Sequence, residues 1–214
     1  MLAAGRSSIR PAHPDDASFI ARIVLAAQRG PLPRGWCDIA LALPEPECLA
    51  FMARLAVARA RSWYHTAHFL IAEVDGEPAA ALCALPAAGT LAAVRDAIAE
   101  VAAETGDDAT RIFARGAYAR NCWVQGGEGD WLIEHVATDA AYRGRGLVQA
   151  LIGRALADGK AAGFGQASIS FLIGNAPAER CYAKAGFAFA EEKRDAAFEA
   201  MTGAPGFRRF ARMI

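Results

Sequence analysis

The chain has 214 residues, of which 54% are hydrophobic and 21% charged, and 23 basic residues balance 23 acidic ones. A chain of this length and composition is expected to fold around its own core rather than remain disordered. The zero net charge argues against a general nucleic-acid-binding protein, which would carry a basic excess. It leaves room for a local cationic pocket that binds one anionic ligand.

The cysteines and histidines predict neither a disulfide framework nor a metal site. The five cysteines are scattered without CxxC spacing, and His65 and His68 have no cysteine or carboxylate beside them at ligand spacing. No apolar run approaches the ~20 residues of a membrane span, and the N-terminal segment lacks the apolar stretch of a signal peptide. We therefore expect a cytoplasmic protein with free thiols, no metal, and no membrane or nucleic-acid partner.

The first part of the chain predicts a strand and helix, a second helix and a β-hairpin. Asp15 or Asp16 is expected to cap the first helix, which Gly30 ends. The Asp75-Gly76 pair is typical of a hairpin turn between two apolar runs. The expected ranges are a strand near 9–11, helices over 17–29 and 49–63, and hairpin strands over 69–74 and 79–85.

Residues 90–129 have a weaker pattern. A helix is expected over 91–104, the sequence TGDD interrupts it, and the residues after 109 show no clear period. We interpret 90–129 as an insertion or substrate-side lid within a single domain that spans 1–214.

The last part of the chain alternates between strand and helix patterns. This order predicts one continuous α/β domain without internal repeats or linkers. The expected elements are a strand over 131–138, a helix over 146–163, a strand over 166–174, a short helix over 176–186, and two final strands over 187–194 and 207–214.

The segment YRGRGLVQAL, residues 142–151, carries the most information about function. It follows a strand and opens a helix, where free backbone N–H groups and the helix dipole favour an anion. Gly144 and Gly146 allow the backbone to approach a ligand closely, and Arg143 and Arg145 add positive charge. This composition suits a diphosphate, although a solvated basic turn is the alternative interpretation.

Two common nucleotide-binding motifs do not fit this segment. It lacks the GxxxxGK[ST] pattern of a Walker loop. It also lacks the third glycine of the dinucleotide fingerprint, because position 149 is glutamine. A nucleotide-dependent kinase or dehydrogenase is therefore not expected.

The loop and a second segment downstream together resemble the GNAT superfamily of acetyl-CoA-dependent N-acetyltransferases. The loop follows the [QR]-x-x-G-x-[GA] pattern from Arg143 to Val148, with valine where glycine or alanine is usual. The second motif, N-x-x-A-x-x-x-Y-x-K-x-G-F, is complete. Its matched residues are Asn175, Ala178, Tyr182, Lys184, Gly186 and Phe187.

The resemblance implies a single α/β (α+β) domain. Its centre would be a mixed, mostly antiparallel sheet of about six or seven strands, flanked by helices and splayed between the fourth and fifth strands. The resemblance covers 131–187 closely, the rest of the chain loosely, and 90–129 hardly at all.

The resemblance also implies that acetyl-CoA binds as the acyl donor. Its pyrophosphate would rest on the loop, and its pantetheine arm would pair with the open backbone of the strand before the loop. The implied cofactor-binding residues are Val136, Ala137, Thr138, Arg143, Gly144, Arg145, Gly146, Leu147, Val148, Gln149, Asn175 and Tyr182.

The implied reaction is direct attack of a primary amine on the thioester in a ternary complex, without an acyl-enzyme. Tyr182 matches the position of a general acid, because a phenol is protonated at neutral pH and can donate to the leaving thiolate. The alternative is a tyrosine that only packs the core. Cys181 has no matched histidine–acid pair, so a cysteine nucleophile is not expected.

A general base is also required, and Glu134 is the first choice. Strand alternation puts Glu134 on the same face as Val136, near which a backbone N–H is expected to stabilise the oxyanion, and opposite His135. A β-bulge would upset this inference. Glu134 as an ordinary strand residue remains an alternative, and His135 is a weaker candidate base.

The acceptor is not specified by any motif. A small-molecule or peptide amine is expected, recognised by residues 25–65, by 90–129 and by the last strands. A non-catalytic acyl-CoA sensor on the same fold is the alternative function, and a homodimer is compatible with the family. Four residues are candidates either for the acceptor side or for ordinary surface and core positions: Arg115, Arg120, Trp123 and Trp131.

Overall fold

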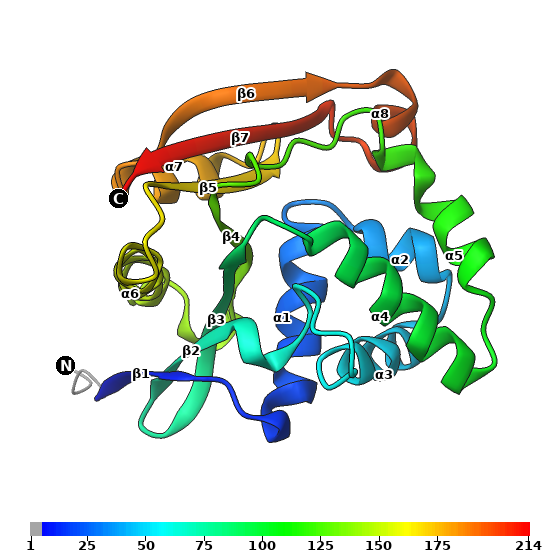
Figure 1. Cartoon of the computed structure of the whole chain (residues 1–214), viewed down its shortest axis with the longest axis horizontal. Coiled ribbons are helices and arrows are strands. Elements are labelled where there is room, and N and C mark those ends of the chain that lie inside the picture. Colours follow the sequence, from blue (N-terminus) through cyan, green and yellow to red (C-terminus); the bar gives the residue numbers. More distant parts are fainter. Residues whose placement is uncertain (1–5) are drawn as a thin grey trace.

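Seven strands form one mixed sheet in the order β1-β2-β3-β4-β5-β7-β6 (Figure 1). The computed structural model describes residues 6–214. Only β4 and β5 run parallel, and every other neighbouring pair is antiparallel. This sheet confirms the predicted α/β fold. The strands are β1 (Ser7–Pro11), β2 (Phe69–Val74), β3 (Glu77–Pro86), β4 (Trp131–Thr138), β5 (Gln166–Leu172), β6 (Ala188–Arg194) and β7 (Gly206–Met213).

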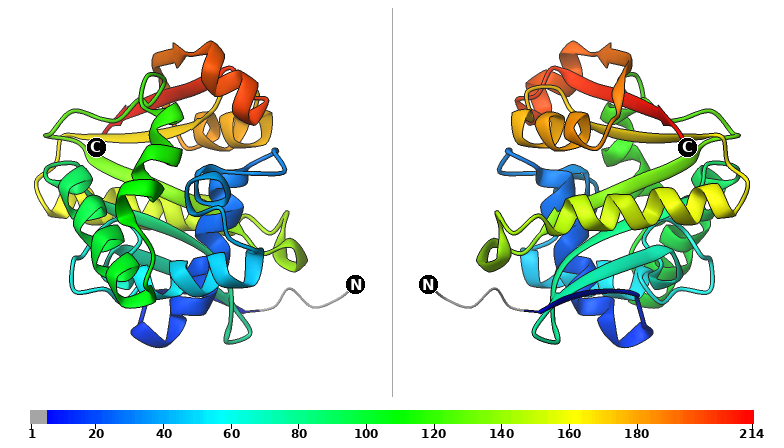
Figure 2. Two further views of the ribbon diagram at one scale, coloured as in Figure 1. Left: turned by 90° about the vertical axis from the view of Figure 1, so that its right-hand side faces the viewer. Right: turned by 90° about the vertical axis from the view of Figure 1, so that its left-hand side faces the viewer.

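Helices cover both faces of the sheet, and Figure 2 shows the two faces in turn. Helices α1 to α5 gather on one face, and α6 lies on the other. None of the helices within residues 6–214 is long and apolar enough to cross a bilayer. The helices are α1 (Ala17–Arg29), α2 (Trp36–Leu41), α3 (Glu45–Leu55), α4 (Thr90–Thr105), α5 (Ala109–Gly116), α6 (Leu147–Ala161), α7 (Ala176–Lys184) and α8 (Ala196–Thr202).

Each face of the sheet has its own hydrophobic core. Strand β4 alternates between them: Leu132 packs into the core under α1 to α5, and Ile133 packs into the core under α6 and α7. Burial on both faces explains why the central strands read as nearly continuous apolar runs. Residues 90–129 contribute Val94, Ile98 and Ile112 to the first core, where α4 packs on α3 and α5 packs on α2.

Strands β4 and β5 separate after a short stretch of pairing. Their ladder runs only from Trp131–Ala167 to Ile133–Ile169. Beyond it, β4 continues along β3 to Thr138, while β5 continues along β7 to Leu172. The backbone of β4 from Glu134 onward is therefore unpaired on its β5 side, and the predicted splay between the fourth and fifth strands is confirmed.

Several helices differ from the sequence-based expectation. The helix predicted over 49–63 runs instead over Glu45–Leu55, because Pro46 suits the first helical turn and the chain turns away after Leu55 to hydrogen-bond Glu100. The short helices α2 and α8 were not predicted. Asp195 caps α8 by accepting a hydrogen bond from the Phe198 N–H, 2.9 Å away.

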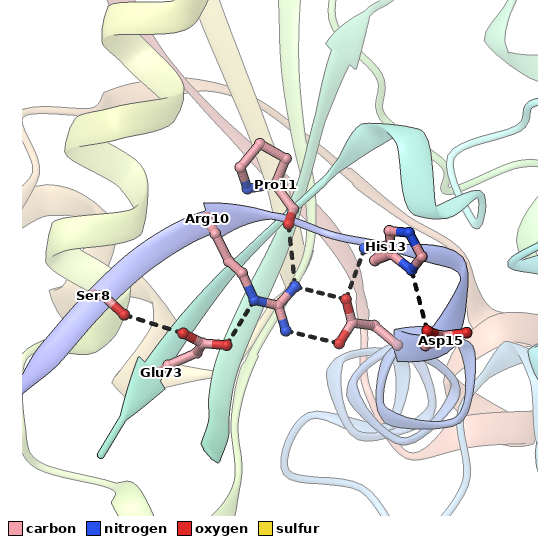
Figure 3. Close-up of polar contacts among 7 residues, drawn as sticks. Ser8, Arg10, Pro11, His13, Asp15 and Glu73 are labelled. Carbon is pink, nitrogen blue, oxygen red and sulfur yellow. Dashed lines mark hydrogen bonds and ion pairs between the residues drawn. The ribbon is translucent and has the colours of Figure 1, made fainter. Parts of the chain in front are cut away.

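The predicted cap of α1 works in another way than expected. Asp16 precedes the helix but makes no hydrogen bond to the helix backbone. Its carboxylate accepts from both terminal nitrogens of Arg10, at 2.7 and 2.9 Å, and from the His13 N–H. Arg10 Nε also donates to Glu73 on β2 at 2.6 Å (Figure 3). Arg10 thus ties β1 to β2 and to the start of α1.

Candidate active site

A cavity of about 790 Å³ opens where β4 and β5 separate. Its walls come from the end of α1, from α2, α4, α5, α7 and α8, and from the central strands. Four residues predicted for catalysis or cofactor binding line it, and so does the weaker candidate base. They are Glu134, His135, Val136, Asn175 and Tyr182.

A β-bulge in β4 shapes the floor of this cavity. Between the pairs Ala81–Ala137 and Cys83–Glu134, β4 contains one more residue than β3, and the extra position at His135 has φ of 51°. A non-glycine residue at positive φ is strained, and such residues concentrate at functional sites.

The bulge corrects the inference from strand alternation. Glu134 pairs with Cys83, which belongs to the core on the α1 face, and the His135 ring stacks with Tyr64 on that same face at 5.2 Å. Val136 packs instead against the core on the α6 face. Glu134 and His135 therefore share a face, and Val136 lies opposite, because the extra residue interrupts the two-residue period.

Glu134 is a buried carboxyl group that lacks a partner among residues 6–214. Its residue exposure is only 7%, and no hydrogen bond or ion pair reaches its carboxyl group from the described part of the chain. Burial raises the pKa of Glu134 to about 8, because the charged form loses its hydration. A carboxyl group that titrates near neutral pH is suited to accept a proton from an amine.

Burial lowers the pKa of His135, whereas it raises that of Glu134. Its exposure is 9%, and desolvation lowers the pKa of His135 to about 3. The imidazole is thus neutral at physiological pH and a poor proton acceptor. Its Nε2 atom is buried and has no hydrogen-bond partner within residues 6–214.

Tyr182 projects from α7 into the same cavity. It is 6% exposed, and its ring makes an edge contact with Phe171 at 5.5 Å. Burial, with smaller effects of Cys181 and Glu134, raises the pKa of the phenol well above its ordinary value. Tyr182 is therefore protonated near neutral pH and can donate a proton.

The Gly–Arg loop lies at the N-terminus of α6. Gly144 and Gly146 have φ of 78° and 76°, and a Cβ at either position would meet no atom within 4 Å. Gly146 is the N-cap of α6, so the N–H groups of the first turn face an open surface. Arg143 and Arg145 are exposed and form no ion pair in the described structure. This end of α6 can hold an anion.

The three residues after Gly146 join the loop to the core. Leu147 is buried, and Val148 packs half-buried against the same core on the α6 face, which accommodates a valine at this position. Gln149 Nε2 donates to the Cys181 carbonyl oxygen at 2.7 Å and so links α6 to α7. Gln149 can therefore offer only its backbone N–H to an anion at the helix end.

Asn175 caps α7 and lines the cavity. Its Oδ1 accepts a hydrogen bond from the Ala178 N–H at 3.2 Å, which leaves Nδ2 as the group that can donate to a ligand. Gly30 lies beside it: a Cβ there would stand 3.1 Å from Asn175 Nδ2. The end of α1 thus closes over Asn175. Val136, Ala137 and Thr138 are half-buried along the open edge of β4.

The four candidates for the acceptor side divide into two pairs. Trp123 and Arg120 line the cavity. Arg115 instead donates to the carbonyl oxygens of Ala40 and Leu41 at the end of α2, and Trp131 packs against α6 beneath Gly159.

Trp63, Tyr64 and Arg95 also line the cavity. They fall within the ranges 25–65 and 90–129 expected on the acceptor side, but they were not singled out from the sequence. Trp63 and Tyr64 lie in an irregular segment without a motif, so no local signal marks them. Arg95 belongs to the i, i+3, i+4, i+7 face of α4 that also carries Leu91, Val94 and Ile98, and that spacing was a usable signal.

The Cys181 thiol is hydrogen-bonded by a side chain of α6. The Cys181 thiol accepts from Gln149 Nε2 at 3.2 Å, and burial raises its pKa, so it stays protonated. Across residues 6–214, no cluster of three or more His, Cys, Asp or Glu side chains is arranged to hold a metal ion.

Comparison with known proteins identifies the family. The model of the acetyltransferase (GNAT) family matches residues 39–187, more than half of the chain. No curated protein matches at a significant level. Among solved structures, an N-acetyltransferase from Staphylococcus aureus Mu50 is 22% identical, with 96% of this chain and 100% of that chain covered and a TM-score of 0.70.

Two further structures share the fold. One acetyltransferase is 20% identical over 97% of this chain and 99% of its own, with a TM-score of 0.69. The polyamine N-acetyltransferase of Drosophila melanogaster, which forms N-acetylagmatine, is 15% identical over 98% of this chain and 100% of its own, with a TM-score of 0.56. The family match and the shared fold show that this chain belongs to the GNAT acetyltransferases, which use acetyl-CoA as cosubstrate.

Proposed function

We propose that this protein transfers the acetyl group of acetyl-CoA directly to the primary amine of a small-molecule or peptide acceptor, without an acyl-enzyme. The observation that carries the proposal is the pairing of Glu134 and Tyr182 in one cavity. One titrates near neutral pH and the other stays protonated. A base and an acid with separated pKa values are what aminolysis of a thioester requires.

The donor is held by backbone groups and arginines. The N–H groups from Gly144 to Gln149 and the charges of Arg143 and Arg145 bind the pyrophosphate. The open edge of β4 from Val136 to Thr138 hydrogen-bonds the amide-rich pantetheine arm, and Asn175 Nδ2 donates to it. These contacts fix the thioester beside the bulge and make the reaction effectively unimolecular.

The chemistry follows from the groups around the bulge. The ionised carboxylate of Glu134 takes a proton from the ammonium of the acceptor, directly or through a water molecule. The neutral amine nitrogen forms a bond to the carbonyl carbon, and a backbone N–H near Val136 stabilises the negative oxygen. The C–S bond then breaks, and Tyr182 donates its proton to the thiolate, while the excess proton on nitrogen returns to solvent.

Two observations on neighbouring residues favour this assignment of roles. The pKa of about 3 disfavours His135 as the base. The Cys181 thiol is engaged by Gln149 and does not line the cavity, which disfavours a covalent cysteine intermediate.

The proposal is tested by measuring CoA thiol release with a broad amine panel, for the natural chain and for Tyr182→Phe. We expect turnover with the natural chain and a fall in kcat of about 10²-fold or more in the variant, because the leaving thiolate loses its proton donor. Calorimetric affinity for acetyl-CoA should be unchanged.

Binding of acetyl-CoA without turnover of any amine would favour the alternative function, a non-catalytic acyl-CoA sensor. An unchanged kcat in Tyr182→Phe would remove Tyr182 from catalysis and leave it as a core residue.

A further inference from the structure

The charged side chains that line the cavity are almost all basic. Within the described residues they are Arg34, Arg95, Arg120 and Glu134. Glu134 is largely uncharged near neutral pH, since its pKa is about 8. The cavity is therefore cationic, although the chain as a whole carries no net charge.

The three arginines are exposed and unpaired in the described structure. Arg34, Arg95 and Arg120 make no side-chain hydrogen bond or ion pair within residues 6–214, in contrast to Arg29 and Arg115 nearby. Arg95 lies one turn after Leu91 on the face of α4 that lines the cavity. Unpaired guanidinium groups at a cavity can bind a carboxylate through two parallel hydrogen bonds.

A continuous row of aromatic rings forms one wall of the same cavity. It starts at the bulge, where the centroids of the His135 and Trp63 rings are 5.7 Å apart, and the Trp63 and Trp123 centroids are 5.6 Å apart. The centroid of Phe207 lies 5.1 Å from that of Trp123 and also 5.1 Å from that of Phe198. Such a wall buries a flat or aromatic apolar group.

The wall also contains a polar donor that lacks an acceptor. The Trp123 indole N–H is buried and has no hydrogen-bond partner among the described residues. An indole can only donate, and buried donors are normally satisfied. The Trp123 Nε1 atom is closed to solvent, whereas the three arginines are exposed donors at the cavity. The complementary ligand group is therefore one rich in lone pairs.

From these observations we infer that the acceptor is an amine whose aromatic or apolar body carries an anionic group such as a carboxylate. The inference rests on the proposed function and names the substrate class of that same site. The amine faces Glu134, the apolar body lies along Trp63 and Trp123, and the carboxylate meets Arg95 or Arg120. A polyamine would bring a second cation toward these arginines, and like charges disfavour binding.

The test compares three acceptors that differ in the substituent at one ring position, which is anionic, neutral or cationic. They are 4-(aminomethyl)benzoate, benzylamine, and benzylamine with a quaternary trimethylammoniomethyl group at the same ring position. The readout is kcat/KM for CoA thiol release. We expect the benzoate to exceed benzylamine by roughly tenfold, which corresponds to about 1.4 kcal/mol, and the quaternary compound to fall below both.

Two variants assign the preference to the arginines. Arg95→Met and Arg120→Met keep apolar bulk and remove the charge. At least one of them should abolish the advantage of the benzoate while leaving kcat/KM for benzylamine unchanged. Arg111→Met is the matched control, because Arg111 is an exposed α5 arginine outside the cavity that pairs with Asp108. Its benzoate preference should equal that of the natural chain.

The outcomes separate the acceptor class from the proposed function. Equal rates for the three amines, or faster turnover of the quaternary compound, would overturn the acceptor class and leave acetyl transfer standing. Weaker acetyl-CoA binding by Arg95→Met and Arg120→Met, measured by calorimetry, would place the two arginines in the acetyl-CoA site. That result would also overturn the inferred acceptor class. Bound acetyl-CoA with no turnover of any amine would overturn both proposals.

Discussion

Glu134 and His135 are adjacent in the chain and equally buried, and burial acts on them with opposite sign. Desolvation raises the pKa of the acid to about 8 and lowers the pKa of the base to about 3. Both groups are therefore mainly uncharged at neutral pH, since a low dielectric disfavours the ionic form of each. Of the two, only Glu134 changes its charge within the pH range in which an enzyme works.

The rate of the proposed reaction should follow the ionisation of Glu134. Because a base acts in its deprotonated form, kcat/KM should rise with pH up to about 8 and level off above it. Glu134→Gln should lower kcat/KM by about 10²- to 10⁴-fold and remove this inflection. The measurement is a pH profile of CoA thiol release for both proteins, with Glu104→Gln on the exposed surface of α4 as control.

Glu134→Gln should make the fold more stable, although it lowers kcat/KM. The folded-state pKa lies above the ordinary value of 4.5, so folding disfavours the ionised form, and the natural chain loses stability as pH rises between these values. Glu134→Gln should therefore unfold at a higher temperature than the natural chain at pH ~8, with a smaller difference at pH ~5. In the profile of kcat/KM against pH, an inflection near pH 8 that persists in Glu134→Gln would assign that ionisation to the amine acceptor instead of Glu134.

At the scale of elements, the end of α6 could be predicted because its determinants are local. Glycines, arginines and the start of an apolar helix all lie between Tyr142 and Leu151. The bulge at His135 could not be predicted, because it depends on how β4 pairs with β3, which is distant in sequence. Helix α8 was missed for a related reason: Phe198 is fixed by packing with Ala119 and Cys122 rather than by a strong local period.

The loop before α6 should fail to bind acetyl-CoA in Gly146→Glu. The added carboxylate meets the pyrophosphate at the helix N-terminus, where the free N–H groups would otherwise bind it. Gly163→Glu is a matched control, because Gly163 lies just after the other end of α6, has φ of 89° and also has open space around it. Calorimetry should detect no binding to the first variant and natural affinity for the second. Equal affinities would remove the loop from the donor site.

The junction of β1, β2 and α1 depends on Arg10. This side chain hydrogen-bonds Asp16 and Glu73, and Arg10 holds the pKa of Asp16 below its ordinary value. Arg10→Met should lower the free energy of unfolding by about 1–3 kcal/mol near pH 7, because two partly buried carboxylates lose their charged donor. Arg154→Met is the control, since its exposed pair with Asp158 on α6 should contribute only ~0.5 kcal/mol.

The effect of Arg10 should weaken in acid. A carboxylate whose folded-state pKa is depressed stabilises the fold above its ordinary pKa, here 3.8, and loses that contribution as pH falls through the folded-state value. Urea unfolding of both proteins between about pH 6 and about pH 3 measures this trend. A difference that stays constant over this range would show that Arg10 acts by packing rather than by charge.

At the scale of the whole molecule, the site lies at the seam between two parts of one sheet. The part with β1 to β4 and α1 to α5 supplies Glu134 and the aromatic wall up to Trp123. The part with β5 to β7, α7 and α8 supplies Asn175, Tyr182 and Phe207. Direct pairing of β4 with β5 is brief, from Trp131 to Ile133.

This arrangement explains which half of the site the sequence predicts. The proposed donor side consists of two short motifs, so the residues from Arg143 to Gln149 and from Asn175 to Tyr182 are recognisable from the sequence alone. The proposed acceptor wall contains Trp63, Trp123 and Phe207, which come from three distant segments. Only the packing of the whole chain brings these rings together, so no spacing rule could have found them.

Acetyl-CoA should join the two parts of the sheet and stabilise the whole fold. A ligand that binds only the folded chain adds RT ln(1 + [L]/Kd), about 2.7 kcal/mol at a hundredfold excess over Kd. For a chain of this size that corresponds to a rise in Tm of roughly 5–11 °C. Thermal unfolding with increasing acetyl-CoA measures this rise, which should be absent in Gly146→Glu. S-acetylpantetheine lacks the pyrophosphate, so it should produce a much smaller shift at equal concentration. Equal shifts for the two compounds would place the binding energy in the cleft between β4 and β5 rather than at the end of α6.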